Sequence, residues 1–121
     1  DYIHRHKTGA LIRAAVRMGA LAAGAGEAAL AAVTAYGEAI GLAFQITDDI
    51  LNETSTAEAL GKAAGSDRAR GKMTFVSVHG IEAARRQAAR LTETALTAIA
   101  PLPGDSAPLD ALARWLAART H

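Results

Sequence analysis

The stretch from Glu27 to about Glu53 constrains the fold of this chain most, because helix-favouring apolar residues fill it almost from end to end. Gly37 and Gly41 are the residues within it that least favour a helix. An internal glycine costs a helix about 1 kcal/mol relative to alanine. Two such glycines are best explained by a second helix that approaches closely at small residues. The stretch therefore predicts one long helix packed against another.

Helices are also predicted on both sides of this stretch. Residues from Tyr2 to about Ala23 favour a helix, which the glycines of 24–26 end. The polar run 54–56 is expected to end the long helix, with Thr56 as the cap of a short helix over 57–60. Beyond it, residues 74–79 predict a helical turn or short helix, and 81–99 predict an amphipathic helix.

The last helix is predicted over residues 107–119, after a turn at 101–106. Asp105 or Ser106 is a suitable cap for it, and Pro108 fits its first turn. No segment predicts a strand, and no repeat has the period of a solenoid. The fold class is therefore all-α.

Composition excludes several classes of protein. The chain has 121 residues, a formal net charge of +1 and no cysteine. It therefore lacks the basic stripe of a general nucleic-acid binder, and it can form neither disulfides nor a thiolate metal site. Charged and amide residues interrupt the apolar runs before the ~18 residues that a membrane span needs. With no secretory signal visible, a cytoplasmic protein is expected. Because Asp1 already lies in helix-favouring sequence, the chain is expected to be part of a longer polypeptide.

Asp48 and Asp49 are the candidate metal ligands. These adjacent carboxylates interrupt an apolar segment, and at 100° per residue Gln45, Asp48, Asp49 and Asn52 fall on one helix face. Like charges placed so closely repel one another unless a cation or solvent compensates them. Mg²⁺ prefers oxygen ligands and often bridges one or two carboxylates to a phosphate. The pair therefore predicts a magnesium site for a phosphorylated ligand.

A glycine-rich segment, residues 61–72, follows the acidic pair. It carries Lys62 and Lys72 among three glycines. Lysine binds phosphate as a point charge, and glycines allow a loop to close over an anion. The segment is interpreted either as a phosphate-binding lid or as an ordinary solvated loop.

The opening segment adds a third motif, His-x-His-Lys-Thr-Gly, which contains Lys7 and Thr8. A Lys-Thr-Gly sequence inside a helix favours a local kink that exposes a carbonyl and these two side chains. The segment is not a P-loop, because the upstream glycine and the preceding strand are missing. His4 and His6 are two residues apart and so lie on different helix faces, which makes them poor metal ligands.

In their order and spacing, the three motifs resemble those of the trans-isoprenyl diphosphate synthases, the family of farnesyl, geranylgeranyl and longer polyprenyl synthases. The resemblance implies the C-terminal half of the all-α isoprenoid-synthase bundle, with residues 1–121 as the C-terminal part of a single polyprenyl synthetase domain, usually in a homodimer. It also implies Mg²⁺-dependent condensation of an allylic diphosphate with isopentenyl diphosphate, with no nucleic acid and no membrane span.

Residue by residue, Asp48 and Asp49 match the start of the family's second aspartate-rich motif and are the expected Mg²⁺ ligands. Lys7 and Lys62 match lysines that hold the allylic diphosphate, and Lys72 matches the lysine of the closing loop. The groups expected to line the allylic cation are Thr8, the Lys7 carbonyl and Gln45. Phe44 matches an aromatic residue beside the isopentenyl site.

Two departures from the family pattern bear on activity. Asn52 stands where the second motif often has a third Asp, and the first aspartate-rich motif is expected upstream of the segment matching Asp1. The isolated chain is therefore expected to be inactive, and its parent to be a prenyl synthase. The alternatives are a non-catalytic subunit of a heteromeric prenyl synthase, a helical interaction module without a ligand, and a related class I terpenoid enzyme.

Overall fold

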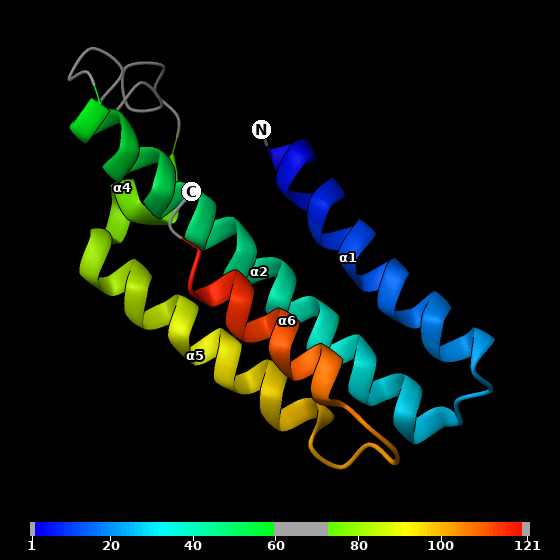
Figure 1. The fold of residues 1–121 in the computed structure, drawn as a ribbon. Coiled ribbons are helices and arrows are strands. Elements are labelled where there is room, and N and C mark those ends of the chain that lie inside the picture. The colour runs from blue at the N-terminus through cyan, green and yellow to red at the C-terminus, as the bar shows by residue number, and fades with distance from the viewer. Residues whose placement is uncertain (1, 60–72, 120–121) are drawn as a thin grey trace.

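The computed structural model describes residues 2–59 and 73–119, and the side chains of 6–55 and 73–119. Within these ranges the chain forms helices and no strand, as predicted (Figure 1). The helices are α1 (Tyr2–Ala22), α2 (Glu27–Ala59), α4 (Phe75–His79), α5 (Ile81–Ile99) and α6 (Ala107–Ala117).

Helix α2 is the central element, with α1 packed along one side and α5 and α6 along another (Figure 1). Its buried residues contribute to two apolar clusters. One joins α2 to α5 and α6 through Tyr36, Ala39, Ile40, Ala95, Ile99 and Ala113. The other joins α2 to α4 and α5 through Ile46, Ile50, Val76, Ala84 and Ala88.

The apolar character of α2 also affects the membrane prediction. Glu27–Ser55 is long and apolar enough to cross a membrane, by length and composition alone. The expectation that charged residues would keep every segment below that limit is therefore wrong for this helix. Burial on several sides accounts for the composition, because a helix covered by neighbours can be apolar around most of its circumference.

Close packing of α1 against α2 confirms the prediction made from the two glycines. A Cβ at Gly37 would lie 2.8 Å from Cγ2 of Val16 and 3.0 Å from Cα of Arg13. A Cβ at Gly41 would lie 3.2 Å from Cα of Gly9. At Gly41 the two backbones meet without a side chain from either helix, and at Gly37 the glycine leaves room for Val16, so a residue larger than glycine would separate the helices.

Two helix ends differ from the prediction. The polar run 54–56 does not end α2, which continues to Ala59 and includes most of the short helix expected over 57–60. The Thr54 hydroxyl donates to the Ile50 carbonyl at 2.9 Å, a bond that a threonine can make inside a helix. Helix α6 ends at Ala117, two residues before the predicted Arg119.

The other boundaries agree closely with the sequence. The α4 helix begins with a reciprocal capping box, in which Thr74 and Ser77 each bond the other's backbone N–H. Ahead of α6, Oδ1 of Asp105 accepts the Ala107 N–H at 2.9 Å, whereas Ser106 occupies the cap position without a side-chain cap bond. Asp105 is thus the residue of the predicted pair that bonds the helix start.

Candidate functional site

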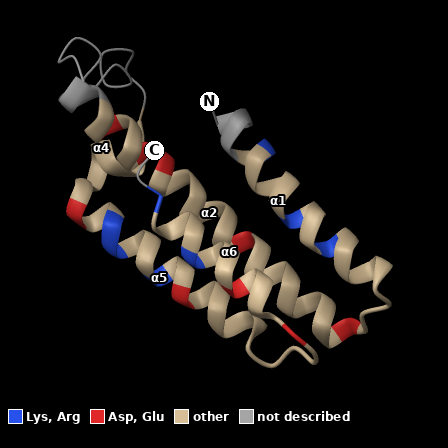
Figure 2. Ribbon diagram, in the orientation of Figure 1, with Lys and Arg blue, Asp and Glu red and all other residues tan. Residues whose placement is uncertain are grey.

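Asp48 forms an ion pair with Arg119, a residue 71 positions away in the sequence. Nη2 of Arg119 lies 2.7 Å from Oδ1 of Asp48. The Arg119 side chain is 17% exposed and that of Asp48 41%, so the pair is only partly open to solvent. In Figure 2 an acidic and a basic residue meet where the chain leaves α6 and lies against α2.

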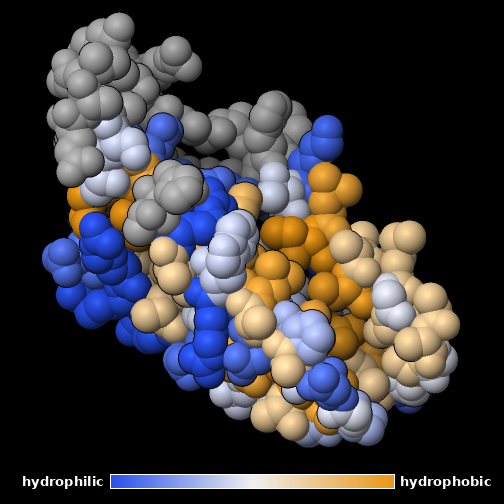
Figure 3. Space-filling view, viewed as in Figure 1, coloured by the Kyte–Doolittle hydropathy of each residue, from blue (hydrophilic) through white to orange (hydrophobic). Residues whose placement is uncertain are grey.

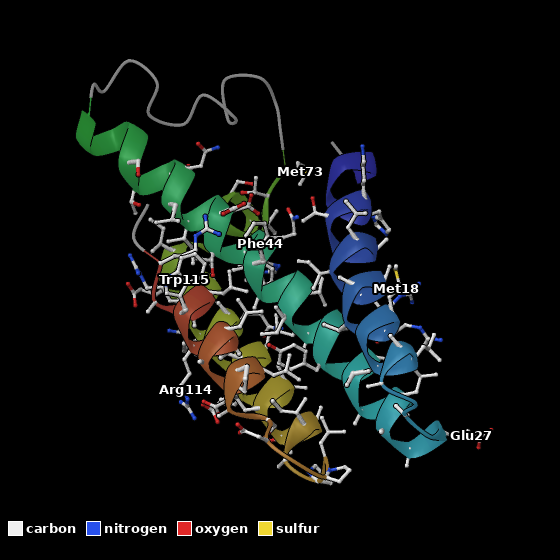
Figure 4. The ribbon with its side chains drawn as sticks, turned by 45° about the vertical axis from the view of Figure 1, so that its right-hand side comes forward. Met18, Glu27, Phe44, Met73, Arg114 and Trp115 are labelled. Carbon is white, nitrogen blue, oxygen red and sulfur yellow. The ribbon has the colours of Figure 1, made fainter. Side chains whose placement is uncertain are left out.

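Phe44 lies on the other side of the same guanidinium. Cζ of Arg119 is 4.8 Å from the centroid of the Phe44 ring, within the range of a cation–π contact. Phe44 and Asp48 are four residues apart on α2, so they project from neighbouring turns of one face. The structure thus brings together two predicted site residues, and Figure 4 shows Phe44 near the end of α6 that carries Trp115.

Gln45 projects into a groove of about 710 Å³ between α1, α2 and α4. Apolar and small residues form much of its lining, and an ion pair between Arg13 and Glu38, at 3.3 Å, belongs to its wall. Figure 3 shows apolar side chains gathered along the strip beside α1. The groove is lined by His6, Gly9, Ala10, Arg13, Glu38, Gly41, Leu42, Gln45, Ile46 and Phe75.

The register of α1 on α2 places Lys7 and Thr8 near these groups. The two helices run antiparallel, with Gly9 facing Gly41 and Arg13 facing Gly37. Counting back one half-turn from Gly9, residues 7 and 8 lie level with residues 43 and 42 of α2. Lys7 is exposed and Thr8 half-buried, and neither belongs to the lining of the groove. Helix α1 continues without a break through the Lys-Thr-Gly sequence where a kink was expected.

The Asp48–Asp49 pair fits a cation that takes most of its ligands from elsewhere. Both side chains are half-buried on α2, and the carboxylate of Asp48 already accepts a cationic group. Among the described residues no three His, Cys, Asp or Glu side chains are grouped closely enough to enclose a metal ion. Mg²⁺ needs no such enclosure, because it keeps several waters and binds through one or two carboxylates plus substrate phosphates.

Two of the predicted site residues, Lys62 and Lys72, lie outside the described part of the chain, as does the whole segment 61–72.

One residue of the observed site, Arg119, was absent from the predicted set. Its position in the sequence, after the last apolar helix, gives no local spacing to residue 48. Only the path of α6 back along α2 brings the two together.

Comparison with known proteins identifies similar chains along the full length. The profile of the polyprenyl synthetase family matches residues 1–99. The chain is 48% identical to farnesyl diphosphate synthase of Escherichia coli (strain K12) over 98% of its own length and 41% of the relative. It is 44% identical to a dimethylallyltranstransferase of Fischerella ambigua, covering all of this chain and 35% of that protein. It is 39% identical to geranylgeranyl pyrophosphate synthase 4 of Arabidopsis thaliana, covering 33% of it. The chain thus spans between a third and two fifths of these relatives.

Proposed function

Because the chain belongs to the polyprenyl synthetase family, we propose that it forms one side of the active site of an isoprenyl diphosphate synthase. The reaction is condensation of an allylic diphosphate with isopentenyl diphosphate. One observation carries the proposal: α2 presents Asp48 and Phe44 on neighbouring turns, in contact with one guanidinium, beside the groove that Gln45 lines. A carboxylate can hold Mg²⁺ for the diphosphate, an aromatic face can stabilise a carbocation, and an apolar groove can take the prenyl chain.

The diphosphate end of the substrate is assigned to the acidic pair and the lysines. In this proposal Asp48 would ligate Mg²⁺ directly, and Asp49 directly or through water. Bound Mg²⁺ would stabilise the negative charge that develops on the leaving diphosphate. Lys7, Lys62 and Lys72 supply further positive charge to the phosphates. No side chain has to act as a nucleophile in this scheme.

The prenyl end of the substrate is assigned to the groove. Loss of diphosphate leaves an allylic cation, which water would quench. The apolar part of the lining keeps water from one side of the cation, while the Phe44 ring and the side-chain oxygens of Thr8 and Gln45 would offer it negative potential. The Lys7 carbonyl was expected at a kink, but α1 is unbroken there. The exposed Lys7 lies on α1, the helix that forms one wall of the groove that Gln45 lines.

The proposal is tested by replacing the matching segment of the E. coli farnesyl diphosphate synthase with this chain, with which it is 48% identical. The chimaera is assayed with an allylic diphosphate and isopentenyl diphosphate, with and without Mg²⁺. We expect prenyl transfer that requires Mg²⁺. A chimaera that folds, as judged by circular dichroism, yet gives no product would contradict the proposal.

Asn52 supports a second candidate, a non-catalytic subunit of a heteromeric prenyl synthase. Asparagine carries one negative charge fewer than the aspartate often found at this position of the motif, and the side chain is exposed on α2. A folded but inactive chimaera that regains turnover with Asn52→Asp would favour this role.

The homodimer and the cytoplasmic location remain predictions. Sedimentation of the chimaera checks the first of them.

A further inference from the structure

Arg119 occupies the carboxylate assigned to the metal. Its guanidinium donates to Oδ1 of Asp48 at 2.7 Å and lies against Phe44 at 4.8 Å. Only 17% of its side chain is exposed, although the residue follows the last helix. An arginine near a chain end normally extends into water. The burial of this one places a cationic group against both Asp48 and Phe44.

The end of α6 makes this contact possible. The helix ends at Ala117, and the N–H of Ala118 bonds to the carbonyls of Arg114, Trp115 and Leu116. Its backbone at φ −89° and ψ 0° closes the last turn. The chain then departs from the helix axis, so Arg119 can reach α2. Were α6 to continue to the predicted Arg119, that side chain would follow the helical phase instead.

A guanidinium and Mg²⁺ bound to the same oxygen of Asp48 would repel each other. Mg²⁺ would lie about 2.0–2.1 Å from its ligand oxygen, and the Arg119 nitrogen lies 2.7 Å from the same atom. Like charges a few ångströms apart repel by about 1 kcal/mol even at the dielectric constant of water, and by more where water is partly excluded. Binding of the metal therefore favours departure of the arginine.

We propose that Arg119 is a stand-in cation, which neutralises Asp48 and covers Phe44 while the metal is absent and leaves both when Mg²⁺ binds. The inference rests on the proposed function, since it takes Asp48 as the metal ligand. Departure of Arg119 also uncovers the Phe44 ring, so metal binding and access to that aromatic face are coupled. Arg119 acts only by occupying Asp48 and Phe44, so we call it a positioning residue and not a catalytic one.

The test measures Mn²⁺ affinity of the 121-residue chain by electron paramagnetic resonance, with Mn²⁺ as a probe for Mg²⁺. Arg119→Gln no longer has to give up an ion pair before the metal binds. We expect its Mn²⁺ affinity to rise roughly twofold to fivefold, within the range measured for solvent-exposed ion pairs. The matched control is Arg114→Gln, which removes an arginine of α6 that pairs with Asp110 and projects away from α2 in Figure 4. Its affinity should equal that of the wild type.

Fluorescence of Trp115 gives a second readout that involves no catalysis. It is the only tryptophan of the chain and lies in the last turn of α6, four residues before Arg119 in the sequence. Mn²⁺ quenches emission directly, so Mg²⁺ is used here. Metal should change the Trp115 emission in the wild type, because the end of α6 is released, and should leave it unchanged in Arg119→Gln.

Asp48→Asn separates failure of this inference from failure of the proposed function. If Asp48→Asn abolishes Mn²⁺ binding while Arg119→Gln binds as tightly as, or more weakly than, the wild type, the stand-in role is overturned and the metal site stands. If Mn²⁺ binds to Asp48→Asn as tightly as to the wild type, Asp48 is not a metal ligand and both proposals are overturned.

Discussion

Tyr36 is the residue that fixes α6 on the middle of the bundle. Its side chain is fully buried, and its hydroxyl donates to the Leu109 carbonyl at 2.7 Å, across 73 positions of sequence. Tyr36→Phe removes this bond and leaves the carbonyl without that donor. We expect the free energy of unfolding to fall by about 1 kcal/mol, measured by urea denaturation. A loss below about 0.3 kcal/mol would show that water replaces the bond.

The same tyrosine makes stability depend on alkaline pH. Burial, and secondarily the nearby Asp110 carboxylate, raise the pKa of Tyr36 above its ordinary value of 10.0. The folded state thus holds the phenolic proton more tightly than the unfolded chain does. The resulting stabilisation is fully present below about pH 10 and is lost as pH rises through the folded pKa. Unfolding curves between pH 8 and 11 should show this loss in the wild type, and a smaller loss in Tyr36→Phe. Equal losses in both proteins would assign the effect to other groups.

Residues of the candidate site were predictable to different extents. Asp48 and Phe44 could be predicted because both belong to one local motif, whose residue spacing lies within α2. Their contact with Arg119 was not, because it depends on where α6 ends and how it returns to α2. Arg119 lies 71 residues from Asp48, and no helical period relates two positions so far apart.

At the scale of elements, glycine was the most informative residue type. Gly37 and Gly41 predicted a close helix neighbour from propensity alone, and α1 is that neighbour. The end of α2 was predicted wrongly, since threonine and serine are common at caps but also bond to carbonyls within a helix. Thr54 does so with Ile50. Side-chain type alone therefore does not distinguish a helix end from its interior.

Gly37→Ala tests the packing of α1 on α2. The new methyl group would lie 2.8 Å from Cγ2 of Val16 and 3.0 Å from Cα of Arg13, so the helices must separate. We expect a loss of about 1–3 kcal/mol in the free energy of unfolding, measured by urea denaturation. The matched control is Gly19→Ala in α1, where a Cβ meets nothing within 4 Å. It should gain up to about 1 kcal/mol from helix propensity. A Gly37→Ala protein as stable as this control would contradict the close packing.

At the scale of the molecule, the bundle brings three distant parts of the chain to one place on α2. The start of α1 lies level with Phe44 and Gln45, and the residue after α6 reaches Asp48. The all-α class was predictable from composition and spacing, whereas this convergence depends on tertiary packing. The groove along α1 is open on one side, with Leu42 57% exposed on its lining.

The 121-residue chain alone should not catalyse prenyl transfer. It spans only a third to two fifths of the relatives described above, and its described residues hold no group of three metal-ligating side chains. One acidic pair cannot hold the several metal ions expected with a diphosphate. The assay combines the chain with an allylic diphosphate, isopentenyl diphosphate and Mg²⁺. Turnover above the background rate would refute this prediction.

The central claim is that Asp48 binds the metal that activates the diphosphate, and turnover of the E. coli chimaera tests it most directly. The measurement compares Asp48→Ala with Asn52→Ala at saturating substrates and Mg²⁺, in proteins of equal helical content. We predict that Asp48→Ala lowers turnover roughly 10²- to 10³-fold, the loss typical when one group that stabilises developing charge is removed. Asn52→Ala should lower it less, by about tenfold, the lower end for a residue that orients a metal ligand without binding the metal itself. Equal losses in the two variants, or no loss in Asp48→Ala, would contradict the account.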